Sequence, residues 1–160
     1  MKSSSIWERW PSLKKYQKTA LHYFSKAIEI DDNREEYHAA IASVYAQLGE
    51  LELAEAHFNN ATEIAPEDTR YWKQYVLFLL ETGQHEAAID TLDIAEESAV
   101  GAELIYCRVA SLFVAGARQE ALLLLSEALE DEYESHSMLF EIVPSLQQDY
   151  EVLSMLKAFS

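Results

Sequence analysis

Small and apolar residues recur along the chain at helical spacing, and a longer period is superimposed on that spacing. Two alanines seven residues apart flank a large apolar residue, which places all three on one stripe of a helix. The arrangement returns after 34, 34 and 33 residues, at Ala20, Phe24 and Ala27; Ala54, Phe58 and Ala61; Ala88, Leu92 and Ala95; and Ala121, Leu125 and Ala128. A period of this length is typical of stacked helical repeats.

Glycines follow the same period, because Gly49, Gly83 and Gly116 are 34 and 33 residues apart. Each glycine falls between two stretches of helical periodicity, where a residue that tolerates positive φ allows a tight turn. Every unit is therefore predicted to be a helix hairpin. The shorter interval requires one deletion between Ala95 and Gly116, most simply in the connection "SAVGAE", where a loop can shorten without disturbing a packed face.

This pattern resembles the tetratricopeptide repeat (TPR). In residues 35–68 the family's characteristic positions are held by Ile41, Ala42, Tyr45, Gly49, Ala54, Phe58, Ala61 and Pro66. The following units keep Trp72, Leu79, Gly83, Ala88, Leu92 and Ala95, and then Val109, Leu112, Gly116, Ala121, Leu125 and Ala128. The resemblance implies an all-α fold, a right-handed superhelix of antiparallel helix hairpins, similar to the C-terminal part of longer bacterial TPR arrays.

Residues 1–160 are predicted to form a single TPR domain. Its parts are a half repeat or N-terminal helix over 1–34, complete repeats over 35–68, 69–101 and 102–135, and a degenerate C-terminal capping hairpin over 136–160. Pro11 suits the first turn of a helix that runs to about Ile30, whereas Pro144 should interrupt the capping hairpin and Asp149 can cap its second helix. Either an atypical helix caps the N-terminal end, or the chain is a piece of a longer repeat protein and Trp7 and Trp10 cover a neighbour.

Two positions depart from the family pattern. His38 stands where TPR sequences usually have tryptophan, with Tyr37 beside it as a substitute filler. Arg108 stands where leucine is usual, so either its guanidinium reaches water over its aliphatic stem or that hairpin opens.

The charge distribution narrows the classes of partner. The formal net charge is -16, yet residues 1–30 carry six basic and two acidic residues, a net of +4, which leaves -20 on the remainder. A surface this acidic repels nucleic acid and anionic membranes. The single cysteine, the absence of a secretory signal pattern and the absence of a membrane-length apolar run favour a cytoplasmic protein.

No residue pattern indicates chemistry. None of the five histidines pairs with another ligand at metal-site spacing, and one thiol, Cys107, cannot build a zinc cluster. Gly-rich phosphate-binding loops are absent, and the acidic stretches lack the ligand spacing of a calcium loop. We therefore expect no enzyme activity, no metal and no cofactor.

The TPR resemblance implies that the first helix of each repeat lines a concave groove that binds peptide segments. The residues expected to form the partner-binding groove are Arg70, Lys73, Leu77, Leu80, Tyr106, Ala110 and Phe113. They predict a non-catalytic scaffold or adaptor that holds a peptide or protein segment. Alternatively, the C-terminal helices or a second copy cover these residues, and the chain is a structural or self-associating segment, with the basic N-terminal part favouring a homodimer.

Overall fold

The computed structural model describes residues 11–31 and 34–160, and the regular elements in these ranges are helices, with no strand among them. The all-α prediction is thereby confirmed. The contacts divide the chain into two compact units, Met1–Ala65 and Pro66–Ser160, and each is described by itself. The predictions for Trp7 and Trp10 lie outside the described residues.

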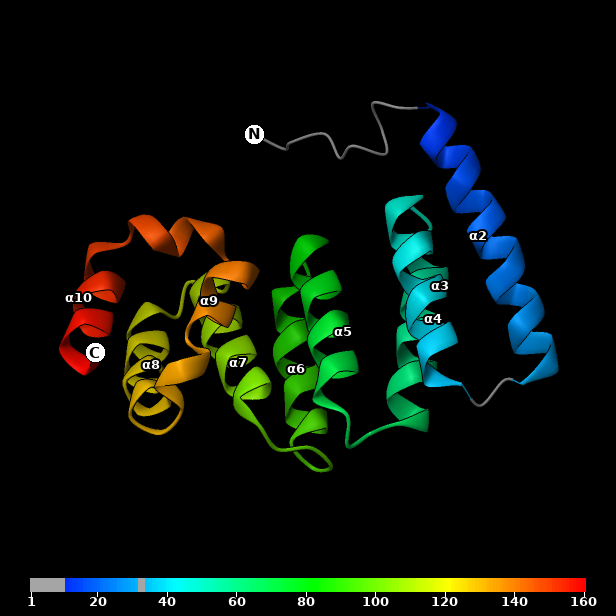
Figure 1. Ribbon diagram of the computed structural model, residues 1–160. Coiled ribbons are helices and arrows are strands. Elements are labelled where there is room, and N and C mark those ends of the chain that lie inside the picture. Colours follow the sequence, from blue (N-terminus) through cyan, green and yellow to red (C-terminus); the bar gives the residue numbers. More distant parts are fainter. Residues whose placement is uncertain (1–10, 32–33) are drawn as a thin grey trace. The chain divides into compact units, whose positions relative to one another are not determined.

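The first unit contains α2 (Pro11–Ile30), α3 (Glu35–Gln47) and α4 (Leu51–Ile64), with α2 packed on α3 and α3 packed on α4 (Figure 1). Helix α2 begins at Pro11, as expected for a residue with a fixed φ and no N–H to satisfy. Between α3 and α4, Gly49 adopts a φ of 83°, and the next N–H, that of Glu50, donates to Tyr45 O at 2.9 Å. The positive φ explains why glycine occupies this turn.

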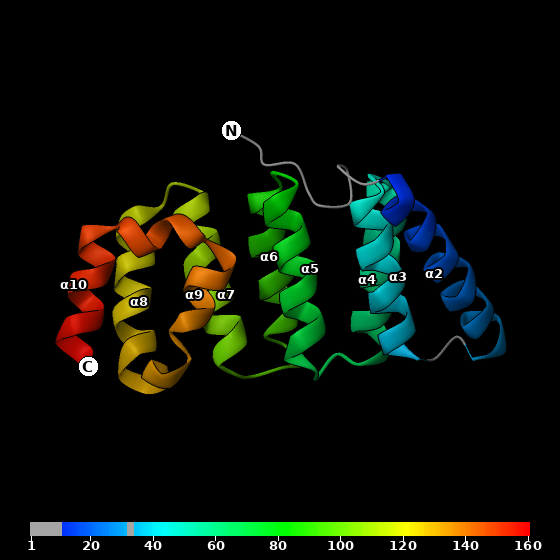
Figure 2. The same cartoon turned by 45° about the horizontal axis from the view of Figure 1, so that its top comes forward.

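The second unit begins with two further hairpins, α5 (Thr69–Glu81) with α6 (His85–Ala95) and α7 (Ala102–Val114) with α8 (Arg118–Glu132), which Figure 2 shows side by side. The Asp68 carboxylate caps α5 by accepting a hydrogen bond from the Arg70 N–H at 3.0 Å. Ala88, Leu92, Ala121 and Leu125 are all fully buried. The residues that define the repeat are therefore core residues, and the small size of the alanines lets neighbouring helices approach closely.

The deletion in the repeat period shortens a helix rather than a loop. Helix α4 has 14 residues, whereas α6 has 11 and ends at Ala95. The connection from there to α7 at Ala102 is longer than the one from Ile64 to α5 at Thr69. The deletion thus lies at the junction where it was predicted, before α7. The loop itself is not shorter, because it replaces the last turn of α6.

The C-terminal segment is an irregular hairpin made of η1 (Tyr133–Ser135), α9 (Ser137–Ile142), η2 (Pro144–Gln148) and α10 (Tyr150–Phe159). Pro144 ends α9 and opens a 3₁₀ turn, because it cannot supply the N–H that would continue the α-helix. The Asp149 carboxylate then accepts from the Val152 N–H at 3.2 Å and caps α10. Both local predictions for this segment are confirmed.

His38 fills the position of the missing tryptophan as a buried residue. It is 5% exposed, its Nδ1 lies 3.0 Å from Nδ1 of His57, and the two rings are stacked with their centroids 5.3 Å apart. The ring of Tyr45 in turn stacks on the ring of His57. Burial, together with the nearby His38, lowers the pKa of His57 below its ordinary value of 6.5.

Acidification is expected to destabilise the first unit through this histidine pair. Because the folded state lowers the pKa of His57, the unfolded chain binds the proton more readily, so stability is full above about pH 6.5 and falls as the pH drops through the lower folded value. Urea unfolding followed by circular dichroism at pH 7.5 and pH 5.0 measures the loss. His57→Gln should show a smaller loss than the native chain, and an equal loss in both proteins would contradict this role.

The second departure from the family pattern, Arg108, pairs with two carboxylates. Its guanidinium donates to Asp93 Oδ1 at 2.7 Å and to Glu96 Oε1 at 3.0 Å, both at the C-terminal end of α6. Partial burial opposes the charge, but these two hydrogen bonds leave the pKa of Arg108 raised above its ordinary value. The side chain is 20% exposed, so the guanidinium is held by carboxylates rather than released to water.

Candidate functional site

The residues predicted to line the groove come from two neighbouring helices of the second unit. Helices α5 and α7 pack against each other, and their first turns are tied by a hydrogen bond from Thr69 Oγ1 to Glu103 Oε1 at 3.2 Å. The predicted residues nevertheless differ in accessibility. Arg70 is exposed and Lys73, Leu77, Leu80 and Phe113 are partly exposed, whereas Tyr106 and Ala110 are fully buried.

Both cations of the α5 surface already contact carboxylates. Arg70 pairs with Asp68 at 2.7 Å, and its guanidinium lies 5.5 Å from the centroid of the Tyr71 ring. The hydrogen bond to Asp68 raises the pKa of Arg70 and lowers that of Asp68. Lys73 Nζ lies 3.1 Å from Oε2 of Glu141, a residue of α9. The α5 surface therefore has the chemistry to hold an acidic group.

Tyr106 belongs to the core of the second unit rather than to an open groove. Its hydroxyl donates to Glu132 O at 2.9 Å, at the end of α8, and burial raises the pKa of Tyr106 to about 12. Ala110 lies in the same apolar cluster, which also contains Leu139 of α9. Neither Tyr106 nor Ala110 offers surface to a partner in this structure, and this corrects the extent of the accessible groove.

Helix α9 makes the accessible groove smaller than the predicted one. It packs on α7 through the fully buried Leu139, and the Lys73–Glu141 pair extends its contacts to α5. The alternative that C-terminal helices cover the groove thus describes the α7 part of the surface. The apolar pattern of residues 138–143 indicated a capping helix, but sequence alone did not show that its carboxylate would reach α5.

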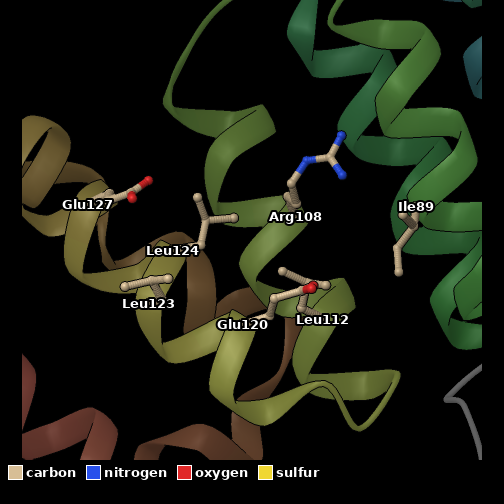
Figure 3. Close-up of a pocket in the computed structure, with 7 residues that line it drawn as sticks. All are labelled: Ile89, Arg108, Leu112, Glu120, Leu123, Leu124 and Glu127. Carbon is tan, nitrogen blue, oxygen red and sulfur yellow. The ribbon is translucent and has the colours of Figure 1, made fainter.

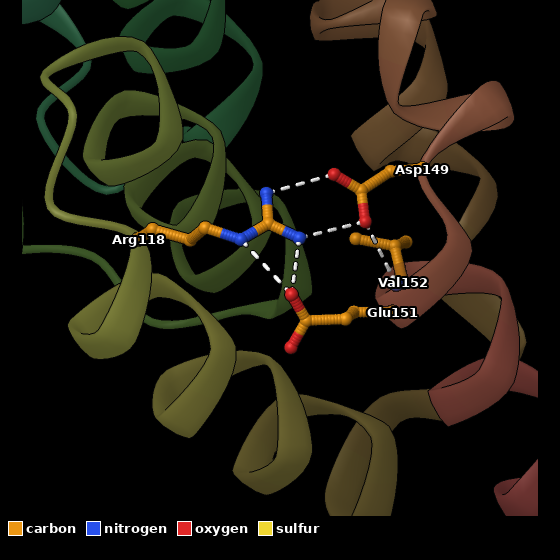
Figure 4. Close-up of polar contacts among 4 residues, drawn as sticks. All are labelled: Arg118, Asp149, Glu151 and Val152. Carbon is orange, nitrogen blue, oxygen red and sulfur yellow. Dashed lines mark hydrogen bonds and ion pairs between the residues drawn. The ribbon is translucent and has the colours of Figure 1, made fainter.

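The last helix is fixed by an ion-pair network at the start of α8 (Figure 4). The Arg118 guanidinium donates to both carboxylate oxygens of Asp149, at 2.8 and 2.9 Å, and to Glu151 Oε1 at 2.8 Å. The hydrogen bonds from Arg118 lower the pKa of Asp149, so the carboxylate that caps α10 stays ionised. Two-point Arg–carboxylate contacts impose orientation as well as charge pairing, which sets where α10 begins.

The described part of the chain holds one free, buried cysteine, Cys107. Cys107 is 1% exposed, and burial raises the pKa of its thiol to about 12, so the thiol stays protonated at neutral pH. Within residues 11–31 and 34–160, no group of three or more His, Cys, Asp or Glu side chains has the arrangement of a metal site. In the same part of the chain, no helix is both long and apolar enough to span a bilayer.

Stacked helix hairpins with a turn glycine and paired alanines are typical of the TPR fold. The comparisons agree, because residues 36–95 match the family described as YpiA-like, C-terminal tetratricopeptide repeats. The chain therefore has the TPR fold, and its residues 36–95 resemble this family. A solved structure, YrrB, described as a TPR protein with an unusual peptide-binding site, is similar with a TM-score of 0.58 and 19% identity, over 92% of this chain and 78% of that chain. No curated protein matches the chain.

Proposed function

We propose that the chain is a non-catalytic interaction module that binds a peptide or protein segment on the exposed groove surface of its second unit. We call this surface the α5 face. It is defined by four residues of α5, Arg70, Lys73, Leu77 and Leu80, together with Phe113 of the neighbouring α7. The observation that carries the proposal is the contact between Lys73 and Glu141. In this contact, helix α9 of the same chain places the Glu141 carboxylate against the α5 face.

The residues of the α5 face favour a ligand that is apolar and carries an acidic group. Leu77 and Leu80 keep part of their apolar surface exposed, which favours contact with apolar side chains. Arg70 and Lys73 lie one helical turn apart on α5, and carboxylates already lie within 3.1 Å of both. Such a combination is typical of grooves that bind an amphipathic helix or an extended segment.

The similarity to YrrB supports this use of the fold, since that protein is described as having a peptide-binding site. At 19% identity the similarity concerns the fold, and the α5 face rests on the residues of this chain. A bacterial and cytoplasmic setting belongs to the same proposal and rests on the family resemblance and on the single cysteine.

A second candidate function is a structural segment that self-associates. It is favoured by three exposed residues at seven-residue spacing on α2, namely Tyr16, Tyr23 and Ile30, which are 67%, 68% and 88% exposed. This stripe follows one side of the helix, and apolar stripes of that kind commonly pack against another helix.

Affinity capture from a lysate of the source organism tests the module. The native chain is compared with the double variant Lys73→Glu, Leu77→Ser, which reverses the charge and removes the apolar surface of the α5 face. A partner should be retained by the native chain and lost from the variant, after circular dichroism has shown that both are equally helical.

The matched control is Lys157→Glu, Ile94→Ser, which makes the same chemical changes at exposed positions on α10 and α6. It should retain the partner. If native chain, variant and control all retain the same proteins, or only further copies of the chain, the α5 face is not the binding surface and the structural function takes its place.

A further inference from the structure

A second concave site lies among α6, α7 and α8, formed mainly by the second helices of their repeats (Figure 3). The hollow has a volume of about 300 Å³ and is lined by Ile89, Arg108, Leu112, Glu120, Leu123, Leu124 and Glu127. None of these residues belongs to the α5 face. The hollow is large enough for apolar side chains of a ligand, since binding pockets begin at about this size.

Arg108 lines the hollow from α7. Arg108 stands where the repeat pattern has leucine, and Figure 3 shows its guanidinium turned toward α6, away from Leu123 and Leu124. The hydrogen bonds to Asp93 and Glu96 hold it there. The guanidinium is thus held at the α6 side of the hollow, and the apolar side chains of Leu112, Leu123 and Leu124 form the wall beside it.

The apolar wall is accessible. Leu123 is 65% exposed, and Ile89 and Leu124 are partly exposed, so a ligand can remove apolar surface from water at this site. Burial of apolar surface is worth about 25 cal/mol per Å².

The charge around the hollow is negative. Arg108 contributes +1, and Asp93, Glu96, Glu120 and Glu127 contribute -4, a sum of -3 at neutral pH. Arg108 is already shared by Asp93 and Glu96, and within the described part of the chain neither Glu120 nor Glu127 forms an ion pair. Two carboxylates at the edge of the hollow are thus available to a cation.

We propose that this hollow binds a segment of another protein that presents a large apolar side chain flanked by lysine or arginine. The apolar side chain enters between Ile89, Leu123 and Leu124, and the cations lie against Glu120 and Glu127. Charge complementarity identifies the occupant, because an acidic or neutral segment would leave two carboxylates unpaired beside a newly buried surface. The proposal does not depend on the α5 face, whose ligand has the opposite charge.

Fluorescence anisotropy with the full chain tests the site. The probes are two fluorescein-labelled 12-residue peptides of alternating leucine and lysine, or alternating leucine and glutamate. The native chain should bind the lysine peptide and not the glutamate peptide. Leu123→Ser should weaken binding at least about tenfold. Glu120→Gln, Glu127→Gln should weaken it about tenfold as well and reduce its dependence on salt.

Each matched control repeats the type of substitution, and therefore the change in net charge, of one of the two variants. Leu153→Ser alters an apolar residue of α10 that is 43% exposed, and Glu52→Gln, Glu63→Gln removes two exposed carboxylates from α4, a helix that does not line the hollow. Both should bind the lysine peptide as the native chain does. Equal weakening in controls and variants would show general attraction to an acidic protein and would overturn the site. A native dimer that Leu123→Ser converts to monomer would also overturn it, because a second copy would then be the occupant.

Discussion

Replacing Trp72 by alanine is expected to lower the free energy of unfolding by about 3–5 kcal/mol. Trp72 is 6% exposed, and its indole N–H donates to Pro66 O at 2.7 Å, at the start of the connection that leads into α5. The substitution leaves a cavity and removes the donor for that carbonyl. Urea unfolding of the full chain, followed by circular dichroism at 222 nm, measures the loss.

The variant Trp72→Phe separates packing from hydrogen bonding. It keeps a large apolar ring but has no N–H for Pro66 O, so a smaller loss is expected, in which the missing hydrogen bond contributes about 1 kcal/mol. A loss below about 1 kcal/mol for Trp72→Ala would place Trp72 outside the core and contradict the repeat register on which the whole fold assignment rests.

Replacing Leu139 by alanine is expected to lower the free energy of unfolding by about 2–5 kcal/mol. Leu139 is fully buried in the apolar cluster that contains Tyr106, Leu125, Leu129 and Val152, so truncation leaves a cavity among residues of four helices. The size of the loss, measured by the same urea titration, shows whether α9 is a permanent part of the second unit.

Leu153→Ala is the control for this prediction. Leu153 lies on the neighbouring helix α10 and is 43% exposed, so its truncation should change the free energy of unfolding by at most about 1 kcal/mol. If Leu139→Ala were as mild as Leu153→Ala, α9 would contribute little to the core. Tyr106 and Ala110 would then be available to a partner after a small displacement, and the groove would extend from α5 onto α7.

Local structure was predictable at residues with a strong conformational preference, such as glycine in turns and proline at helix ends. Gly49 turns with positive φ, Pro11 opens a helix, Pro144 ends one, and Asp149 caps one, because these preferences depend on the backbone of a few adjacent residues. The repeat period extended this reasoning to the core, since alanines at fixed spacing must face a closely packed helix. Fold class and most core positions followed from these local rules.

The candidate sites depended on contacts between distant parts of the chain. Arg108 departs from the repeat pattern, but the direction of its guanidinium is set by Asp93 and Glu96 at the end of another helix. It lines one hollow with Leu123 and Leu124 of α8. The carboxylate that reaches Lys73 is 68 residues away in the sequence. No periodicity encodes which of several exposed carboxylates will lie near a given cation.

The TPR fold, its hairpins and the residues that hold them together could be predicted from the repeat pattern of the sequence. Repeat spacing fixes these features because each hairpin must bury the same stripe against its neighbour. The burial of Tyr106 and Ala110 and the contact between Lys73 and Glu141 could not be predicted in this way, because they depend on where α9 packs. The reason is physical: the irregular C-terminal segment has no repeat partner to copy, so its position on α7 is set by how Leu139 and the Arg118–Asp149 pair fit the rest of the second unit.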